Sequence, residues 1–120
     1  MHELSILIEA LRIVEETALQ QNIPSVKGVV LQVGELCSVV PKFLEDYFPI
    51  VIENKPIFND AVLKIEMLPG IARCQKCHTT FNVVENKGYC PNCNSYDKDL
   101  VSGDEFFIKE ILVPDSESAQ

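Results

Sequence analysis

Apolar residues recur at helical spacing near the start of the chain. They alternate with charged and polar residues and occupy positions Leu4, Leu7, Ile8, Leu11, Val14 and Ala18. Spacings of three and four residues place such side chains on one face of an α-helix. The pattern predicts an amphipathic helix that ends near Asn22, with Pro24 just beyond its end.

Other segments have the composition and alternation of strands. Residues 26–33 are rich in valine, residues 61–68 alternate apolar and charged positions, and residues 105–113 return to a strand-like composition. Between the first two strands, Pro41 is suited to open a second helix. Pro49 is expected to kink that helix or to end it early.

Four cysteines follow the predicted strand of residues 61–68 as two C-x2-C pairs separated by twelve residues: Cys74, Cys77, Cys90 and Cys93. Two such pairs place four thiolates around one point, and tetrahedral sulfur coordination suits zinc and, less often, iron. Four protein ligands leave no open position for a water molecule, so we expect a structural site. Residues 81–89 predict a strand, a turn and a strand, and residues 94–103 predict a polar turn.

The order of elements predicts an α+β fold in which two helices lie on a three-stranded, mostly antiparallel sheet, with an inserted small zinc-ribbon domain. Residues 1–70 and 100–113 are expected to form the α/β domain, residues 71–99 the ribbon and residues 114–120 a disordered tail. An insert of roughly 30 residues is too small for a hydrophobic core of its own, so it needs a crosslink such as a metal ion.

Charge and composition narrow the function. The net charge is −8, which opposes a nucleic-acid backbone, and the ribbon has no stripe of basic residues. No apolar run reaches the roughly 20 residues of a membrane span, and no secretory signal is expected. We therefore expect a cytoplasmic protein that binds neither nucleic acid nor membrane, in which cysteines bind metal rather than form disulfides.

The N-terminus offers a second set of metal ligands. The Met1 amine, the backbone nitrogen of His2 and its imidazole could meet one ion, with the backbone nitrogen or carboxylate of Glu3 as a fourth ligand. Planar nitrogen donors suit Ni(II) or Cu(II). The simpler interpretation is a helix end with Glu3 near the positive end of the helix dipole. Spacing alone leaves both interpretations open.

Three function classes remain at this point: a metal-handling protein, a rubredoxin-like iron electron carrier, and a zinc-ribbon module that binds nucleic acid or protein. Catalysis is not supported, because no nucleophile–base pair or phosphate-binding glycine loop is present, so we predict that the protein is not an enzyme. Cys37 is interpreted as a half-buried small hydrophobic residue. His78 is interpreted as a solvated loop histidine rather than a ligand.

The chain as a whole resembles the HypA/HybF family of hydrogenase maturation factors. The resemblance rests on an ordered series of motifs: Met1-His2-Glu3-Leu4-Ser5, Val33-Gly34-Glu35-Leu36, Val39-Val40-Pro41, Ala61 to Glu66 with Pro69, the four cysteines with Cys90-Pro91-x-Cys93, and Gly103-Asp104-Glu105 leading into Ile108 and Ile111. Cys37 stands where the family often has serine, and Pro49 interrupts a helix that is usually continuous.

The resemblance implies a nickel metallochaperone. It implies transported nickel at His2, helped by the Met1 amine and Glu3, in the domain formed by residues 1–70 and 100–113. It also implies structural zinc on the four cysteines. The implied partners are the nickel-handling GTPase HypB and the large-subunit precursor of [NiFe]-hydrogenase.

Overall fold

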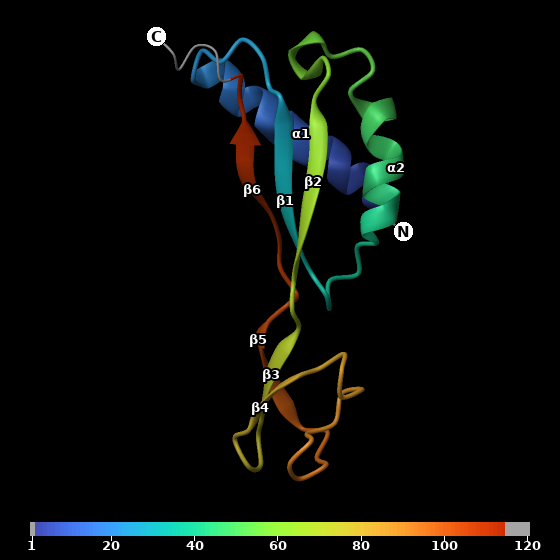
Figure 1. Cartoon of the computed structure of the whole chain (residues 1–120), viewed down its shortest axis with the longest axis vertical. Coiled ribbons are helices and arrows are strands. Elements are labelled where there is room, and N and C mark those ends of the chain that lie inside the picture. The colour runs from blue at the N-terminus through green and yellow to red at the C-terminus, as the bar shows by residue number, and fades with distance from the viewer. Residues whose placement is uncertain (1, 115–120) are drawn as a thin grey trace. The chain divides into compact units, whose positions relative to one another are not determined.

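Within residues 2–114, the regular structure consists of two α-helices, one 3₁₀ turn and six strands (Figure 1). The computed structural model describes residues 2–114, so Met1 and most of the predicted tail lie outside the described residues. In chain order the elements are α1 (Glu3–Gln20), β1 (Gly28–Gly34), α2 (Pro41–Val51), a 3₁₀ turn (Pro56–Phe58), β2 (Val62–Leu68), β3 (Ile71–Cys74), β4 (Thr80–Asn82), β5 (Lys98–Ser102) and β6 (Phe106–Leu112).

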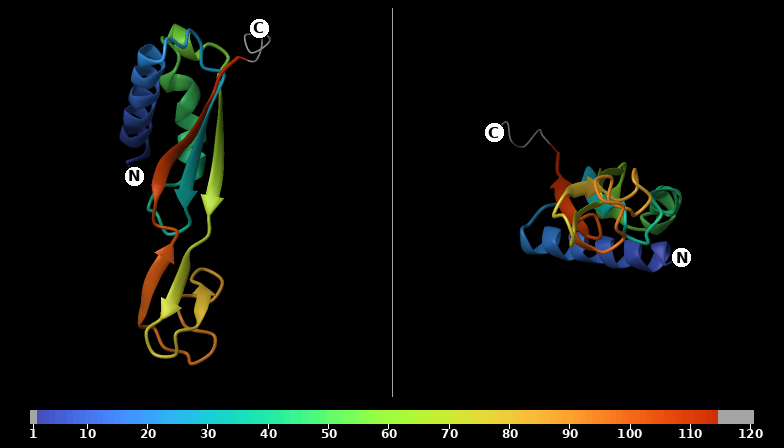
Figure 2. Two further views of the ribbon diagram at one scale, coloured as in Figure 1. Left: turned by 90° about the vertical axis from the view of Figure 1, so that its left-hand side faces the viewer. Right: turned by 90° about the horizontal axis from the view of Figure 1, so that it is seen from below.

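The strands form two three-stranded sheets, ordered β2-β1-β6 and β4-β3-β5. In the first sheet β6 runs antiparallel to β1, and the N–H of Lys27 donates to the carbonyl of Leu112 at 2.7 Å. β2 runs in the same direction as β1, and both helices lie on the same side of this sheet (Figure 2). Both pairings of the second sheet are antiparallel. The predicted α+β fold with two helices and mostly antiparallel pairing is confirmed.

The chain divides into two compact units. The helical unit comprises Met1–Leu31, Val39–Glu66 and Phe107–Gln120, and the ribbon unit comprises Gln32–Ser38 and Met67–Phe106. The ribbon unit therefore contains the predicted insert together with chain that flanks it. The predicted zinc-ribbon domain of residues 71–99 stays a prediction.

The helical unit has a hydrocarbon core. The buried face of α1 presents Leu7, Leu11, Val14 and Ala18, which follow the predicted helical spacing. Leu4 and Ile8 share that spacing but are 42% and 50% exposed, because they lie at the margin of the apolar face. α2 continues for two residues beyond Pro49 and then ends at Val51, as expected of a helix that contains a residue without a backbone N–H.

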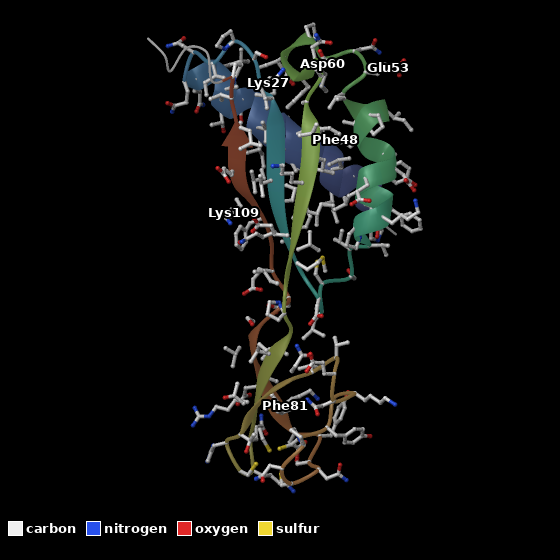
Figure 3. The ribbon with its side chains drawn as sticks, viewed as in Figure 1. Lys27, Phe48, Glu53, Asp60, Phe81 and Lys109 are labelled. Atoms are coloured by element: carbon white, nitrogen blue, oxygen red, sulfur yellow. The ribbon has the colours of Figure 1, made fainter. Side chains whose placement is uncertain are left out.

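The ribbon sheet differs from the prediction in which segments form strands. β4 pairs with β3, placing Ala72 opposite Phe81, and both side chains are buried. Phe81 is labelled in Figure 3. The predicted second strand near residue 89 is wrong, since residues 83–89 form turns. The third strand is instead β5, which lies in the segment predicted to be a polar turn. β5 is largely exposed, so backbone pairing with β3 holds it without an alternating hydrophobic pattern.

Three glycines meet within the ribbon unit. A Cβ on Gly34 would lie 2.0 Å from the carbonyl oxygen of Gly103, and a Cβ on Gly103 would lie 2.4 Å from the Cα of Gly70. Gly103 also has φ +108°, a conformation that side chains disfavour. Glu35 accepts the Gly70 N–H, and Glu105 accepts the Gly103 N–H, each at 2.8 Å. Gly34, Gly70 and Gly103, which are far apart in sequence, therefore lie where three backbone segments approach closely. We call this place the glycine crossing.

Candidate metal sites

The four paired cysteines lie together, as predicted. Their sulfur atoms are all within 4.8 Å of one another, and two pairs, Cys74–Cys93 and Cys77–Cys90, are 3.5 Å apart. A disulfide would need a separation of about 2.05 Å, so these are thiols. Four sulfurs at about 2.3 Å from a tetrahedral zinc ion would be about 3.8 Å apart. The cluster therefore fits a zinc-like ion with four sulfur ligands.

Each C-x2-C pair is shaped by the same backbone arrangement. In the first pair, the N–H of Cys74 donates to the carbonyl of Thr79 at 2.9 Å, and the N–H of His78 donates back to the carbonyl of Cys74 at 3.0 Å. The equivalent bonds of the second pair, with lengths of 2.9 and 2.8 Å, join Cys90 to Ser95 and Asn94 to Cys90. Both turns close through backbone bonds between residues no more than five positions apart, so much of the ligand geometry is encoded locally.

His78 and Asn94 occupy equivalent places in these turns. Their φ angles are +64° and +65°, in the left-handed region that non-glycine residues seldom adopt. The side chain of His78 is exposed, which agrees with the prediction of a solvated loop histidine. Its position after Cys77 is thus explained by the backbone turn.

Backbone and side-chain donors surround the first two thiols. The sulfur of Cys74 accepts N–H groups of Cys77 at 3.5 Å and Lys76 at 3.4 Å, and these bonds lower its pKa. The pKa of Cys77 is lowered to about 5, first by the Asn92 side chain and then by Thr79. Hydrogen bonds to a thiolate favour the charged form, which is the metal ligand.

The pKa of the fourth thiol, Cys93, is shifted upward instead. The Ser95 N–H lowers the pKa of Cys93, but its contact with Cys74 and its partial desolvation together raise that pKa to about 12. Cys74 and Cys90 are 1% exposed, whereas Cys93 is exposed. Neighbouring thiolates repel further negative charge, and a bound cation would offset that repulsion. This donor set therefore suits a bound metal ion.

His2 lies at the other candidate site. It is the residue that precedes the first turn of α1, its side chain is exposed, and its carbonyl accepts the Ile6 N–H at 3.0 Å. Within residues 2–114, its imidazole makes no capping hydrogen bond. The first N–H groups of a helix have no intrahelical acceptor. The imidazole is therefore open to solvent; the predicted partner Met1 lies outside the described residues.

Glu3 is placed differently from His2. Its side chain is 2% exposed, and its Oε2 accepts the N–H of Val40 at 2.8 Å. The pKa of Glu3 is lowered to about 2, first by a hydrogen bond with the amine of the chain's N-terminus and then by the Val40 N–H. The carboxylate predicted as one candidate nickel ligand is thus already bonded within the protein. The contact with Val40 was not predicted from the sequence. Val40 is 37 residues away, and it donates its backbone N–H while its side chain is apolar.

Among residues 2–114, the cysteine cluster is the one group of three or more potential metal-binding side chains close enough to share an ion. In the same part of the chain, neither helix is long and apolar enough to cross a lipid bilayer.

Comparisons with known proteins agree with this arrangement. Residues 1–113 match the family described as "Hydrogenase/urease nickel incorporation, metallochaperone, hypA". A hydrogenase maturation factor HypA of Dechloromonas aromatica is 37% identical over 113 residues, covering 94% of this chain and 99% of the relative. The corresponding protein of Moorella thermoacetica is 38% identical over 108 residues, covering 90% and 95%.

Solved structures show the same fold. The solution structure of the Ni metallochaperone HypA from Helicobacter pylori has a TM-score of 0.66 and 23% identity, covering 94% of this chain and 97% of that one. A second solution structure of a HypA protein has a TM-score of 0.68 with 23% identity, covering 95% and 97%.

Proposed function

This chain belongs to the HypA family, and from that premise we propose that it binds Ni(II) at its N-terminus and delivers it for the maturation of [NiFe]-hydrogenase. The observation that carries this proposal is the exposed imidazole of His2, which lies at the start of α1 within the segment that matches the family. A cargo ion must be released, and ligands at an exposed chain end are accessible to a competing partner.

Nickel would be held by the imidazole and backbone nitrogen of His2 and by the Met1 amine. Glu3 would supply its backbone nitrogen, because its carboxylate is bonded to Val40. Nitrogen donors in this arrangement suit Ni(II) better than tetrahedral zinc. Since the amine and the imidazole must lose protons to bind, nickel affinity should fall as pH is lowered.

Zinc would be held by Cys74, Cys77, Cys90 and Cys93. Their sulfurs fill the four positions of a tetrahedral ion, so the bound metal stabilises the ribbon and offers no site for a substrate. The ribbon and the N-terminus would then bind different metals for different purposes, one structural and one transported.

The remaining parts of the proposal follow from the family. The protein would act as a chaperone and not as an enzyme, in the cytoplasm. Its partners would be the GTPase HypB and the large-subunit precursor of [NiFe]-hydrogenase. Metal analysis separates this function from the two alternatives: an iron electron carrier would contain coloured iron, and a nucleic-acid ribbon would contain zinc but bind no nickel.

The test is a nickel titration of untagged, zinc-loaded protein with two variants. His2→Ala should retain one zinc ion and lose high-affinity nickel binding, whereas His78→Ala should match the wild type. His78 is a suitable control because it is also an exposed histidine. Undiminished nickel affinity in His2→Ala would overturn the proposed nickel site.

A further inference from the structure

The second helix begins without a cap of its own. Val40 is its N-cap residue and cannot accept a hydrogen bond through its side chain, and the first turn of α2 contains no acidic residue. Helix N-termini are normally stabilised by a polar N-cap side chain or by nearby negative charge, because their first N–H groups lack intrahelical acceptors. The start of α2 therefore needs a partner from elsewhere.

Glu3 supplies that partner from α1. Its Oε2 lies 2.8 Å from the backbone nitrogen of Val40, and its side chain is 2% exposed. The carbonyl of Val40 in turn accepts the N–H groups of Phe43 at 3.1 Å and Leu44 at 3.4 Å. Val40 is thus fixed on both sides, by α1 through its N–H and by α2 through its carbonyl.

The carboxylate also lies at two positive helix ends. Glu3 is the first residue of α1, and it contacts the N-cap residue of α2. A buried negative charge in this place is favoured by both helix dipoles and by a charge-assisted hydrogen bond. Moving the carboxylate onto a metal ion would leave the Val40 N–H without this acceptor, which is costly for a partly buried backbone group.

We propose that Glu3 is a positioning residue whose carboxylate caps α2 and thereby holds the nickel-binding N-terminus in place, without itself coordinating nickel. This inference rests on the proposed function, since it concerns the same nickel site. It assigns the carboxylate to the Glu3–Val40 cap and leaves coordination to nitrogen atoms around His2.

Glutamine separates the two roles of the Glu3 side chain. An amide oxygen can still accept the Val40 N–H, but a neutral amide is a poor metal ligand in place of a carboxylate. Alanine removes the acceptor. Glu9→Gln is a matched control, because it also removes a carboxylate from α1. The Glu9 carboxylate accepts a hydrogen bond from the exposed Arg12 of the same helix.

The experiment uses untagged, zinc-loaded full-length protein and three readouts: nickel affinity, the absorption spectrum of the nickel-bound protein, and hydrogen exchange of the Val40 amide measured without nickel. Glu3→Gln should keep nickel affinity within about threefold and an unchanged spectrum, because the cap persists. Glu3→Ala should exchange the Val40 amide at least about tenfold faster and bind nickel more weakly, again with an unchanged spectrum at saturation. Glu9→Gln should match the wild type in all three.

Two results would overturn the inference. Loss of nickel affinity in Glu3→Gln as large as in His2→Ala, or a changed nickel spectrum, would make the carboxylate a ligand. Unchanged Val40 exchange in Glu3→Ala would show that the cap contributes nothing. Because Val40 exchange is measured without nickel, it tests the cap even where His2→Ala retains nickel and the proposed function fails.

Discussion

The helical unit and the ribbon sheet differ in the number and kind of side chains that they bury. In the helical unit, Leu7, Leu11 and Phe58 are completely buried within a core of aliphatic and aromatic side chains. The buried cluster of the ribbon sheet consists of four residues: Ala72, Cys74, Phe81 and Cys90. Two of these four are candidate metal ligands. Hydrophobic burial can therefore stabilise the first region, whereas we expect the second to depend on a metal ion.

Removing the ribbon metal should have the largest effect. We expect Cys74→Ala, or chelation of zinc from the wild type, to unfold the ribbon, because structural zinc contributes roughly 10–16 kcal/mol in small finger peptides. The helices should persist, since their core contains none of the four cysteines. Heteronuclear NMR would show collapsed dispersion for residues 73–98 while amides of α1 keep their positions. Well-dispersed ribbon signals in zinc-free protein would contradict this dependence on metal.

Opening a cavity in the helical unit should have the next largest effect. Leu11 is 0% exposed, and replacing it with alanine should cost about 2–5 kcal/mol of unfolding free energy. Zinc content should remain at one ion per chain. Denaturant unfolding and metal analysis of the same sample measure both quantities. Loss of zinc in folded Leu11→Ala protein would show that the two regions are not stabilised separately.

A substitution at the glycine crossing of the ribbon unit should lower stability by an intermediate amount. Gly103→Ala places a methyl group 2.4 Å from the Cα of Gly70 at a φ of +108°. We expect a loss of about 2 kcal/mol or more, because neither the backbone contact nor the backbone conformation can relax cheaply. Denaturant unfolding measures this loss. Ser102→Ala is a neighbouring control that retains the backbone conformation, and equal stability of the two variants would contradict the steric argument.

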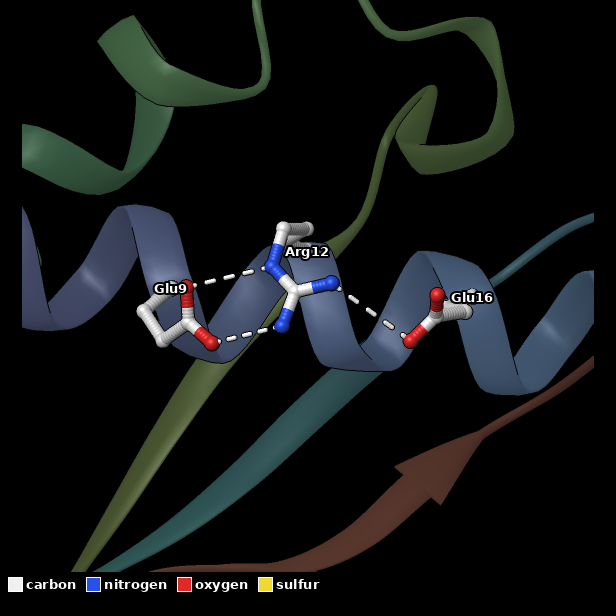
Figure 4. A network of polar contacts seen from close by, with 3 residues as sticks. All are labelled: Glu9, Arg12 and Glu16. Atoms are coloured by element: carbon white, nitrogen blue, oxygen red, sulfur yellow. Dashed lines mark hydrogen bonds and ion pairs between the residues drawn. The ribbon is translucent and has the colours of Figure 1, made fainter.

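The smallest change is expected from the exposed ion pairs of α1. Arg12 donates to Glu9 at 3.1 and 2.6 Å and to Glu16 at 3.5 Å (Figure 4). Arg12→Ala should shift the midpoint of thermal unfolding by no more than about 2 °C at neutral pH, because surface ion pairs contribute little. A larger shift would mean that this surface contributes more than its exposure suggests.

The pH dependence of that shift has a definite sign. The hydrogen bond from Arg12 lowers the pKa of Glu9 below its ordinary value of 4.5. The pair therefore stabilises the folded state above pH 4.5, and its contribution is lost as pH falls through the lowered pKa. The thermal midpoints of wild type and Arg12→Ala should therefore converge as pH falls through and below the lowered pKa of Glu9.

The same contrast explains which features were predictable from sequence. α1 and β2 follow the predicted periodicity: Leu7 and Leu11 are buried on α1, and half-buried residues alternate with exposed ones along most of β2. β1 was indicated by its valine content and is buried along nearly its whole length. The metal ligands follow from cysteine spacing, since each C-x2-C turn closes through bonds such as that between Cys74 and Thr79. β5 was missed because Leu100 and Val101 are 48% and 61% exposed, so burial imposes no alternation on that strand.

Long-range polar contacts were the other features beyond prediction. The Glu3–Val40 bond joins a carboxylate to a backbone N–H, and any non-proline residue at position 40 would provide the same donor. No local pattern can identify such a partner. The proposed cap of α2 therefore required the structure, whereas the likeness of the Met1-His2-Glu3 segment to the HypA/HybF family was visible in the sequence.

Two metals are expected to bind to two separate sets of ligands in this protein. X-ray absorption at the zinc and nickel edges of one untagged, doubly loaded sample distinguishes the two sets. We expect zinc with four sulfur neighbours at about 2.3 Å and nickel with nitrogen or oxygen neighbours and no sulfur. Sulfur around nickel, or fewer than four sulfurs around zinc, would contradict the assignment of the cysteines to a closed structural site and of His2 to the transported ion.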